Sequence, residues 1–93
     1  MSGNPRADEI AVVALAWLAA DVDLMGRFMV QSGLSPGDLR NLADAPETLA
    51  AVLDFVLEDE ATARRFCMEN RLGAEQLMRA RAALPGGADP HWT

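Results

Sequence analysis

The chain carries one pattern of apolar, capping and turn residues twice, at a spacing of 38 positions. Identities of this kind can arise by chance in a chain rich in alanine and leucine, but here each falls at an equivalent structural place, which favours a duplication. One helix–helix–short-helix unit cannot enclose its own apolar face, whereas two such units can bury their faces against each other. The identical pairs are Leu15 and Leu53, Asp21 and Asp59, Arg27 and Arg65, Phe28 and Phe66, Leu34 and Leu72, and Leu39 and Leu77.

Each half opens on a long helical stripe of apolar residues. The first stripe belongs to a segment that is apolar on nearly all sides, with Val12 and Leu15 on the far side from the stripe. Such a helix should be central in the fold or covered by a second copy of the protein. The stripes are Ile10, Val13, Ala14, Trp17 and Leu18 in the first half, and Leu49, Val52, Leu53, Val56 and Leu57 in the second.

Capping and breaking residues predict where the helices begin and end. The last helix is expected to carry Leu77, Met78 and Leu84 on its apolar side. The boundary signals in chain order are Asn4–Pro5 as a start, Asp21 as a cap, Gly33 as an end, Ser35–Asp38 as a capping box, Asp44–Glu47 as a start, Asp59 as a cap, Gly73 as a start and Pro85–Gly87 as a stop.

We therefore predict an all-α fold, because no segment shows the alternation typical of a strand. The expected architecture is a compact five- to six-helix orthogonal bundle built from two similar helix–helix–short-helix repeats. The first repeat spans about residues 5–44 and the second about 45–84. Residues 1–84 then form a single helical domain, and residues 85–93 a mobile tail.

Four sequence motifs carry a likeness to a known family. They are L-A-x-D at 18–21, G-R-F at 26–28, S-G-L-S-P-x-D-L at 32–39 and L-A-A-V-L-D-F-V-L-x-D-E at 49–60. With these motifs the chain, from about Ile10 to Leu84, resembles a family of short all-helical bacterial proteins catalogued only as a domain of unknown function. The resemblance implies an all-helical fold and brings no activity and no catalytic residues with it.

Composition excludes several classes of function. The 93 residues suit one domain, and a net charge of −6 without lysine argues against a generic binder of nucleic acid or anionic membranes. A single cysteine rules out an internal disulfide framework and a cysteine-based zinc site.

The apolar run Ile10–Ala20 is shorter than the roughly 20 residues of a spanning helix and follows two acids, unlike a secretory signal. We expect a soluble, cytoplasmic bacterial protein.

Acidic clusters and the lone thiol have structural explanations. Asp21 and Asp59, each beside further acids, are better explained as helix caps than as calcium ligands, since no calcium loop surrounds them. Cys67 fits a small core residue better than a nucleophile, and His91 lies in the tail. We therefore expect no enzyme activity, no metal and no cofactor.

Charge is distributed unevenly along the chain. Residues 1–60 hold eleven acids and three arginines, whereas residues 61–84 hold five arginines and two acids. This local excess of arginine is either a solvated face laced by helix pairs or a docking patch for an acidic protein surface. The candidate interaction residues are Arg64, Arg65, Arg71, Arg79 and Arg81.

These observations favour a non-catalytic protein-interaction module that binds a protein partner or a second copy of itself. The alternative is a helix-turn-helix-like nucleic-acid binder that uses the last helix, with Gln76, Arg79 and Arg81 as contacts. The overall negative charge disfavours this alternative.

Overall fold

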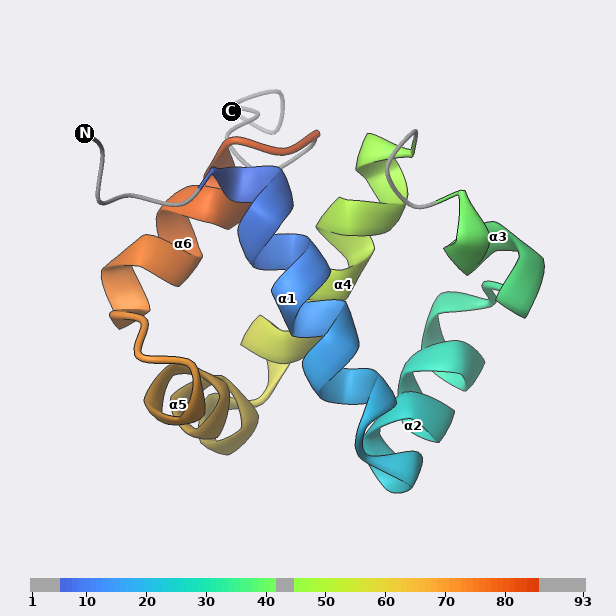
Figure 1. Cartoon of the computed structure of the whole chain (residues 1–93), viewed down its shortest axis with the longest axis horizontal. Coiled ribbons are helices and arrows are strands. Elements are labelled where there is room, and N and C mark those ends of the chain that lie inside the picture. Colours follow the sequence, from blue (N-terminus) through green and yellow to red (C-terminus); the bar gives the residue numbers. More distant parts are fainter. Residues whose placement is uncertain (1–5, 42–44, 86–93) are drawn as a thin grey trace.

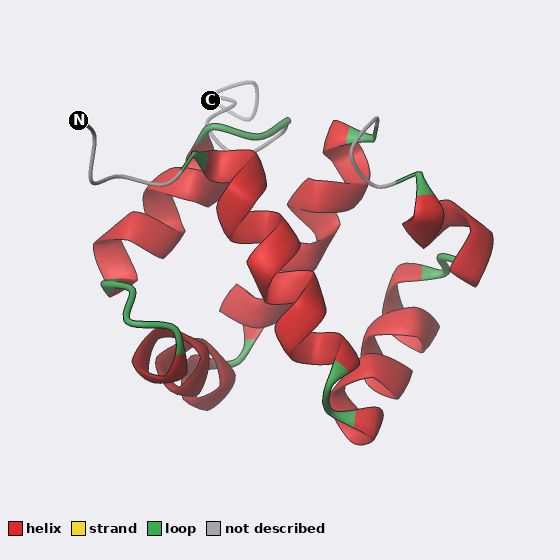
Figure 2. Ribbon diagram, viewed as in Figure 1, coloured by secondary structure: helices red, strands yellow, loops and turns green. Residues whose placement is uncertain are grey.

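The chain is helical throughout the part that the structure describes. The computed structural model describes residues 6–41 and 45–85, and these contain six helices and no strand (Figure 1, Figure 2), which confirms the all-α prediction. No helix of these residues has the length and apolar character needed to cross a membrane. The helices are α1 (Ala7–Ala19), α2 (Val22–Ser32), α3 (Pro36–Arg40), α4 (Pro46–Glu58), α5 (Glu60–Glu69) and α6 (Ala74–Ala82).

Two helices, α1 and α4, form the centre of the molecule and cross each other (Figure 1). Their mutual packing is the most extensive between any two described helices. The pair α2 and α3 lies on one side of this crossing, and the pair α5 and α6 lies on the other. Helix α6 also packs on α1 and α4, whereas α3 makes no comparable contact with another described helix.

Small and medium-sized side chains of α1 and α4 form the core. Ala11 and Ala14 are fully buried on α1, and their methyl groups let its backbone approach its neighbours closely. Phe28 from α2 and Phe66 from α5 are the largest fully buried side chains among the described residues. The buried apolar residues are Ile10, Ala11, Ala14, Leu18, Leu24, Phe28, Leu49, Ala50, Val52, Leu53, Val56, Phe66, Cys67, Leu77 and Ala80.

Two predicted core positions are wrong. Val13 is 42% exposed, and Ala11 occupies the buried face of α1 instead. The reason is that α1 is apolar on nearly all sides, so its hydrophobic periodicity does not select one face, and close helix packing selects the smaller residue. Met78 is 63% exposed on α6, where Leu77 and Ala80 face the core.

Three predicted caps are confirmed. Asp21 Oδ1 accepts hydrogen bonds from the backbone N–H groups of Asp23 and Leu24 at 3.0 and 3.2 Å. Asp59 Oδ2 accepts one from the N–H of Thr62 at 3.1 Å. Ser35 and Asp38 form a reciprocal capping box at the start of α3. Side-chain acceptors thus fix the first turn of α2, α3 and α5.

The predicted start of the first helix is wrong by two residues. Arg6 has extended backbone angles, and α1 begins at Ala7, where Glu9 Oε1 accepts from the Arg6 N–H at 2.9 Å. The expected signals Asn4–Pro5 and Asp44 lie outside the described residues, as does the expected tail beyond Pro85.

Aromatic contacts around the central helices occur as a matched pair. Trp17 of α1 packs edge-on against Phe66 of α5, with ring centroids 5.3 Å apart. Phe55 of α4 packs edge-on against Phe28 of α2 at 5.5 Å. At the spacing of 38, Trp17 corresponds to Phe55 and Phe66 to Phe28, so the second contact is the first with the halves exchanged. This agreement supports the duplication, which stays a prediction.

Helices α2 and α5 are each followed by a residue with left-handed backbone angles. Gly33 has φ 74° after α2, and Arg71 has φ 56° after α5. Past α5 the N–H of Leu72 bonds to the carbonyl of Cys67 at 2.9 Å, which is the long-range bond of a Schellman turn. Gly33 and Arg71 correspond at the spacing of 38. Glycine adopts this conformation without steric strain, whereas the side chain of Arg71 makes it unfavourable.

We expect opposite effects from substitutions at these two positions. Gly33→Ala should lower the free energy of unfolding by about 1 kcal/mol through backbone strain alone, since a Cβ there meets no atom within 4 Å. Arg71→Gly should raise it by about 0.5–1 kcal/mol. Thermal unfolding checks both, because 1 kcal/mol shifts the midpoint of a domain of this size by about 4–8 °C. Equal destabilisation by both would contradict this account of the two turns.

Candidate functional site

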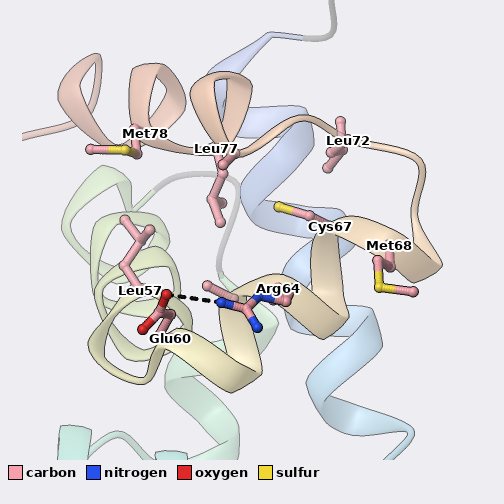
Figure 3. A pocket seen from close by; sticks show the side chains of 10 residues that line it. Leu57, Glu60, Arg64, Cys67, Met68, Leu72, Leu77 and Met78 are labelled. Atoms are coloured by element: carbon pink, nitrogen blue, oxygen red, sulfur yellow. Dashed lines mark hydrogen bonds and ion pairs between the residues drawn. The ribbon is translucent and has the colours of Figure 1, made fainter.

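An open groove of about 610 Å³ lies between α5 and α6. It is bordered by the end of α4, one face of α5, the turn after α5 and the first turns of α6 (Figure 3). Most of its lining is apolar. The lining residues are Leu57, Glu60, Ala63, Arg64, Cys67, Met68, Leu72, Ala74, Leu77 and Met78.

Helical spacing explains which side chains face this groove. The lining residues of α5 lie at positions i, i+3, i+4, i+7 and i+8 from Glu60 to Met68, so they share one face of the helix. Ala63 on α5 and Ala74 on α6 carry only methyl groups. The space between the two helices is therefore left open.

The groove has a buried floor and an exposed apolar rim. Leu77 is 1% exposed and Cys67 8%, whereas Met68 is 75% exposed and Met78 63%. In Figure 3, Leu77 points from α6 into the groove, and the two methionines lie at opposite ends of it. Methionine is flexible and polarizable, so such a rim can adapt to apolar side chains of different shapes.

One ion pair lies at the polar edge of the groove. Arg64 Nη2 donates to Glu60 Oε2 at 2.9 Å, one helical turn away on α5. Both side chains are well exposed. Ion pairs of this kind contribute little to stability, about 0.3–0.5 kcal/mol, so each partner can rearrange at small cost.

The face of α5 that points away from the groove is fixed to α1. The Trp17 indole Nε1–H donates to Glu69 Oε1 at 2.7 Å, and the Arg65 Nε–H donates to Glu69 Oε2 at 3.0 Å. The Arg65 guanidinium also lies 5.2 Å from the centroid of the Trp17 ring and 3.6 Å from Asp21 Oδ2. Hydrogen bonds from Trp17 and then Arg65 lower the pKa of Glu69. These contacts set the position of α5 beside the groove.

The five arginines of the predicted interaction patch do not face one surface. Arg64 lines the groove, and Arg65 contacts α1. Arg81, whose side chain is 16% exposed, bonds through Nη2 to Asp54 Oδ2 of α4 at 3.1 Å. Arg79 pairs with the exposed Glu75 at 3.4 Å, and Arg71 forms no ion pair with any other described residue.

The polar residues expected to read nucleic acid from the last helix also have partners inside the chain. Gln76 Oε1 accepts from the Gly73 N–H at 2.8 Å, which caps α6. Arg79 and Arg81 are held by Glu75 and Asp54. The nucleic-acid alternative stays a prediction.

The acidic and thiol groups occupy structural positions. Asp21 and Asp59 are caps, and hydrogen bonds from the Thr62 side chain and backbone lower the pKa of Asp59. Burial raises the pKa of the Cys67 thiol, which keeps the groove floor uncharged at neutral pH. Within residues 6–41 and 45–85, no group of three or more His, Cys, Asp or Glu side chains converges as metal ligands would. His91 lies outside the described residues.

The groove is the feature that sequence reasoning missed. The sequence pattern places Met78 on the apolar side of the last helix and gives Met68 no role. One signal in the sequence could have indicated the groove. The apolar face of α5, which includes Ala63, Cys67 and Met68, is wider than the strip of helix surface that packs into the core.

The crossing helices of residues 6–41 and 45–85 pack around one core and define this protein as a small all-α domain. The family model described as "Protein of unknown function (DUF3572)" matches residues 4–87. The chain belongs to this family, which confirms the resemblance drawn from its motifs. No curated protein and no solved structure matches it.

We expect the Trp17→Phe substitution to raise the pKa of Glu69 toward its ordinary value of 4.5. The indole N–H of Trp17 stabilises the ionised carboxylate, and phenylalanine has no such donor. Carbon-13 NMR titration of the carboxyl carbon measures this pKa, with Asp59 as the unaffected control. Folding lowers this pKa, so the stability that Glu69 contributes is complete above pH 4.5 and is lost as the pH falls through the folded value. Identical Glu69 titrations in both proteins would show that Trp17 does not act on the carboxylate.

Proposed function

We propose that this domain is a protein-interaction module and that the groove between α5 and α6 binds a helical segment of a partner protein. The observation that carries the proposal is the pair of exposed methionines, Met68 and Met78, at either end of an apolar groove of about 610 Å³. Exposed apolar side chains scattered singly are normal, but an exposed apolar rim around a hollow is typical of a binding surface.

The dimensions of the groove suit an amphipathic helix. Helix α5 has 10 residues and α6 has 9, so each is about 13–15 Å long. A partner helix of two to three turns can place apolar side chains at i, i+4 and i+7 along that length. Leu77 at the floor supplies a packed surface, and the methionines can close over the inserted side chains.

We also propose that the protein acts in the cytoplasm of a bacterium. Cys67 is a free thiol in the fold, which is compatible with a reducing compartment.

The proposal is tested with a peptide that carries a leucine stripe at i, i+4 and i+7 and uncharged glutamine flanks. We expect this peptide to shift the methyl NMR signals of Met68 and Met78 and to leave those of Met25 and Met29 on α2 unchanged. The double substitution Met68→Gln, Met78→Gln should weaken binding at least tenfold. Full burial of a methionine side chain contributes about 1.5–3 kcal/mol, and about 1.4 kcal/mol corresponds to a tenfold change in affinity.

A matched control carries Val22→Thr and Val30→Thr, which remove apolar groups that are 85% and 86% exposed on α2, outside the groove. We expect this control to bind the peptide as the unsubstituted protein does. Equal weakening in both variants, or methyl shifts on α2 alone, would contradict the placement of the site. Thermal unfolding of each variant verifies that the fold is retained.

A further inference from the structure

The charged groups beside the groove restrict the partners that it can bind. On α5, the exposed Met68 stands four residues after Arg64 and three residues before Arg71. Arg71 is exposed and forms no ion pair with another described residue, and Arg64 is held only by the exposed Glu60. Arg64 therefore lines the groove on this side, and Arg71 lies in the turn that borders it.

The other rim has one exposed arginine next to its methionine in the chain. Met78 on α6 is followed directly by Arg79, whose side chain is 72% exposed. Among the described residues, its one ion pair is with Glu75, which is 81% exposed and one turn away. Surface pairs of this kind are weak, so Arg64 and Arg79 can exchange their present partners for a carboxylate of a bound helix.

The remaining two arginines of α5 and α6 are not available in the same way. Arg65 is held by Glu69, Asp21 and the face of Trp17. Arg81 is largely buried against Asp54. The exposed arginines open to a partner here are thus Arg64, which lines the groove, and Arg71 and Arg79, which adjoin the lining residues Leu72 and Met78 in the chain.

The net charge of −6 does not cancel this local effect. Most of the acids lie in residues 1–60, whereas residues 61–84 hold five arginines and two acids. At physiological ionic strength the Debye length is about 8 Å, so exposed carboxylates farther away than this are largely screened from a helix bound in the groove. Beside the groove, the paired acids Glu60 and Glu75 offset two of the three arginines, which leaves a local excess of one positive charge.

We propose that the partner segment is an acidic amphipathic helix, with an apolar stripe in the groove and Asp or Glu side chains on its flanks facing Arg64, Arg71 and Arg79. This inference rests on the proposed function and adds the chemical class of the partner. The apolar contacts provide affinity, and the flanking charges set the choice among helices with similar stripes.

Three peptides with one leucine stripe test the inference: the first has glutamine flanks, the second glutamate flanks and the third lysine flanks. Fluorescence anisotropy at about 0.15 M salt measures the dissociation constants. We expect the glutamate peptide to bind about three- to tenfold more tightly than the glutamine peptide, and the lysine peptide to bind most weakly. The advantage of the glutamate peptide should shrink as salt is raised.

Matched substitutions locate the charges responsible. Arg64→Gln with Arg71→Gln should remove most of the preference for the glutamate peptide, because it weakens binding of that peptide much more than binding of the glutamine peptide. The control Arg27→Gln with Arg40→Gln removes two exposed arginines of α2 and α3, outside the groove, and should keep the preference.

The outcomes separate this inference from the proposed function. Binding of the glutamine peptide at Met68 and Met78 without a preference for glutamate overturns the inference and leaves the interaction module standing. A preference for lysine also overturns it. Absence of binding by all three peptides overturns both proposals. A concentration-dependent dimer that the Met68→Gln, Met78→Gln variant loses overturns the acidic-helix assignment as well, because a second copy would then be the occupant.

Discussion

The close crossing of α1 and α4 is the contact on which the rest of the fold depends. Ala11 and Ala14 are fully buried on α1, and Val52, Leu53 and Val56 are fully buried on α4. Side chains this small cannot fill a core alone when two helices cross, because the helices diverge on either side of the crossing point. The larger side chains that fill these flanks must come from other helices.

Phe28 and Phe66 fill that role, and they also determine which surfaces stay open. Each is buried to about 1% exposure or less and meets one aromatic ring of a central helix edge-on. Phe66 commits one face of α5 to the core, and the Trp17–Glu69 contact fixes the neighbouring face to α1. The remaining apolar face, with Ala63 and Met68, faces α6 and the end of α4 across the groove. The groove thus results from how the core is closed.

Local signals in the sequence were sufficient for the helices and most of their boundaries. Asp21, Ser35 and Asp59 accept the hydrogen bonds that their positions predicted, because a cap depends on three or four adjacent residues. The buried face of α1 could not be predicted in the same way. Val13 and Ala11 are both apolar, and only the tight approach of a neighbouring helix decides between them.

The site was less accessible from the sequence than the fold, for a physical reason. A run of arginines is visible in the sequence, but the carboxylates that neutralise it are not: Asp54 stands 27 positions from Arg81, and Asp21 stands 44 positions from Arg65. A groove is harder still to predict, because it is defined by space that side chains leave unfilled. Whether Met78 is core or rim depends on the rotation of α6 about its axis, and Leu77 and Ala80 set that rotation by packing inward.

The difference between α3 and α6 explains why the open groove lies in the second half of the chain. If the halves arose by duplication, they began with equivalent third helices. In the present fold α3 has five residues, whereas α6 has nine and packs on α1, α4 and α5. The longer helix lies across α5 and is anchored by Leu77, which is 1% exposed. That anchor holds one wall of the groove in place by its buried contact, whereas Met68 and Met78 at the rim are largely exposed. Val22 and Val30 are more exposed than either methionine, yet neither lines this hollow. The combination of a fixed wall and an adaptable rim, rather than exposure alone, distinguishes this groove from the exposed valines of α2.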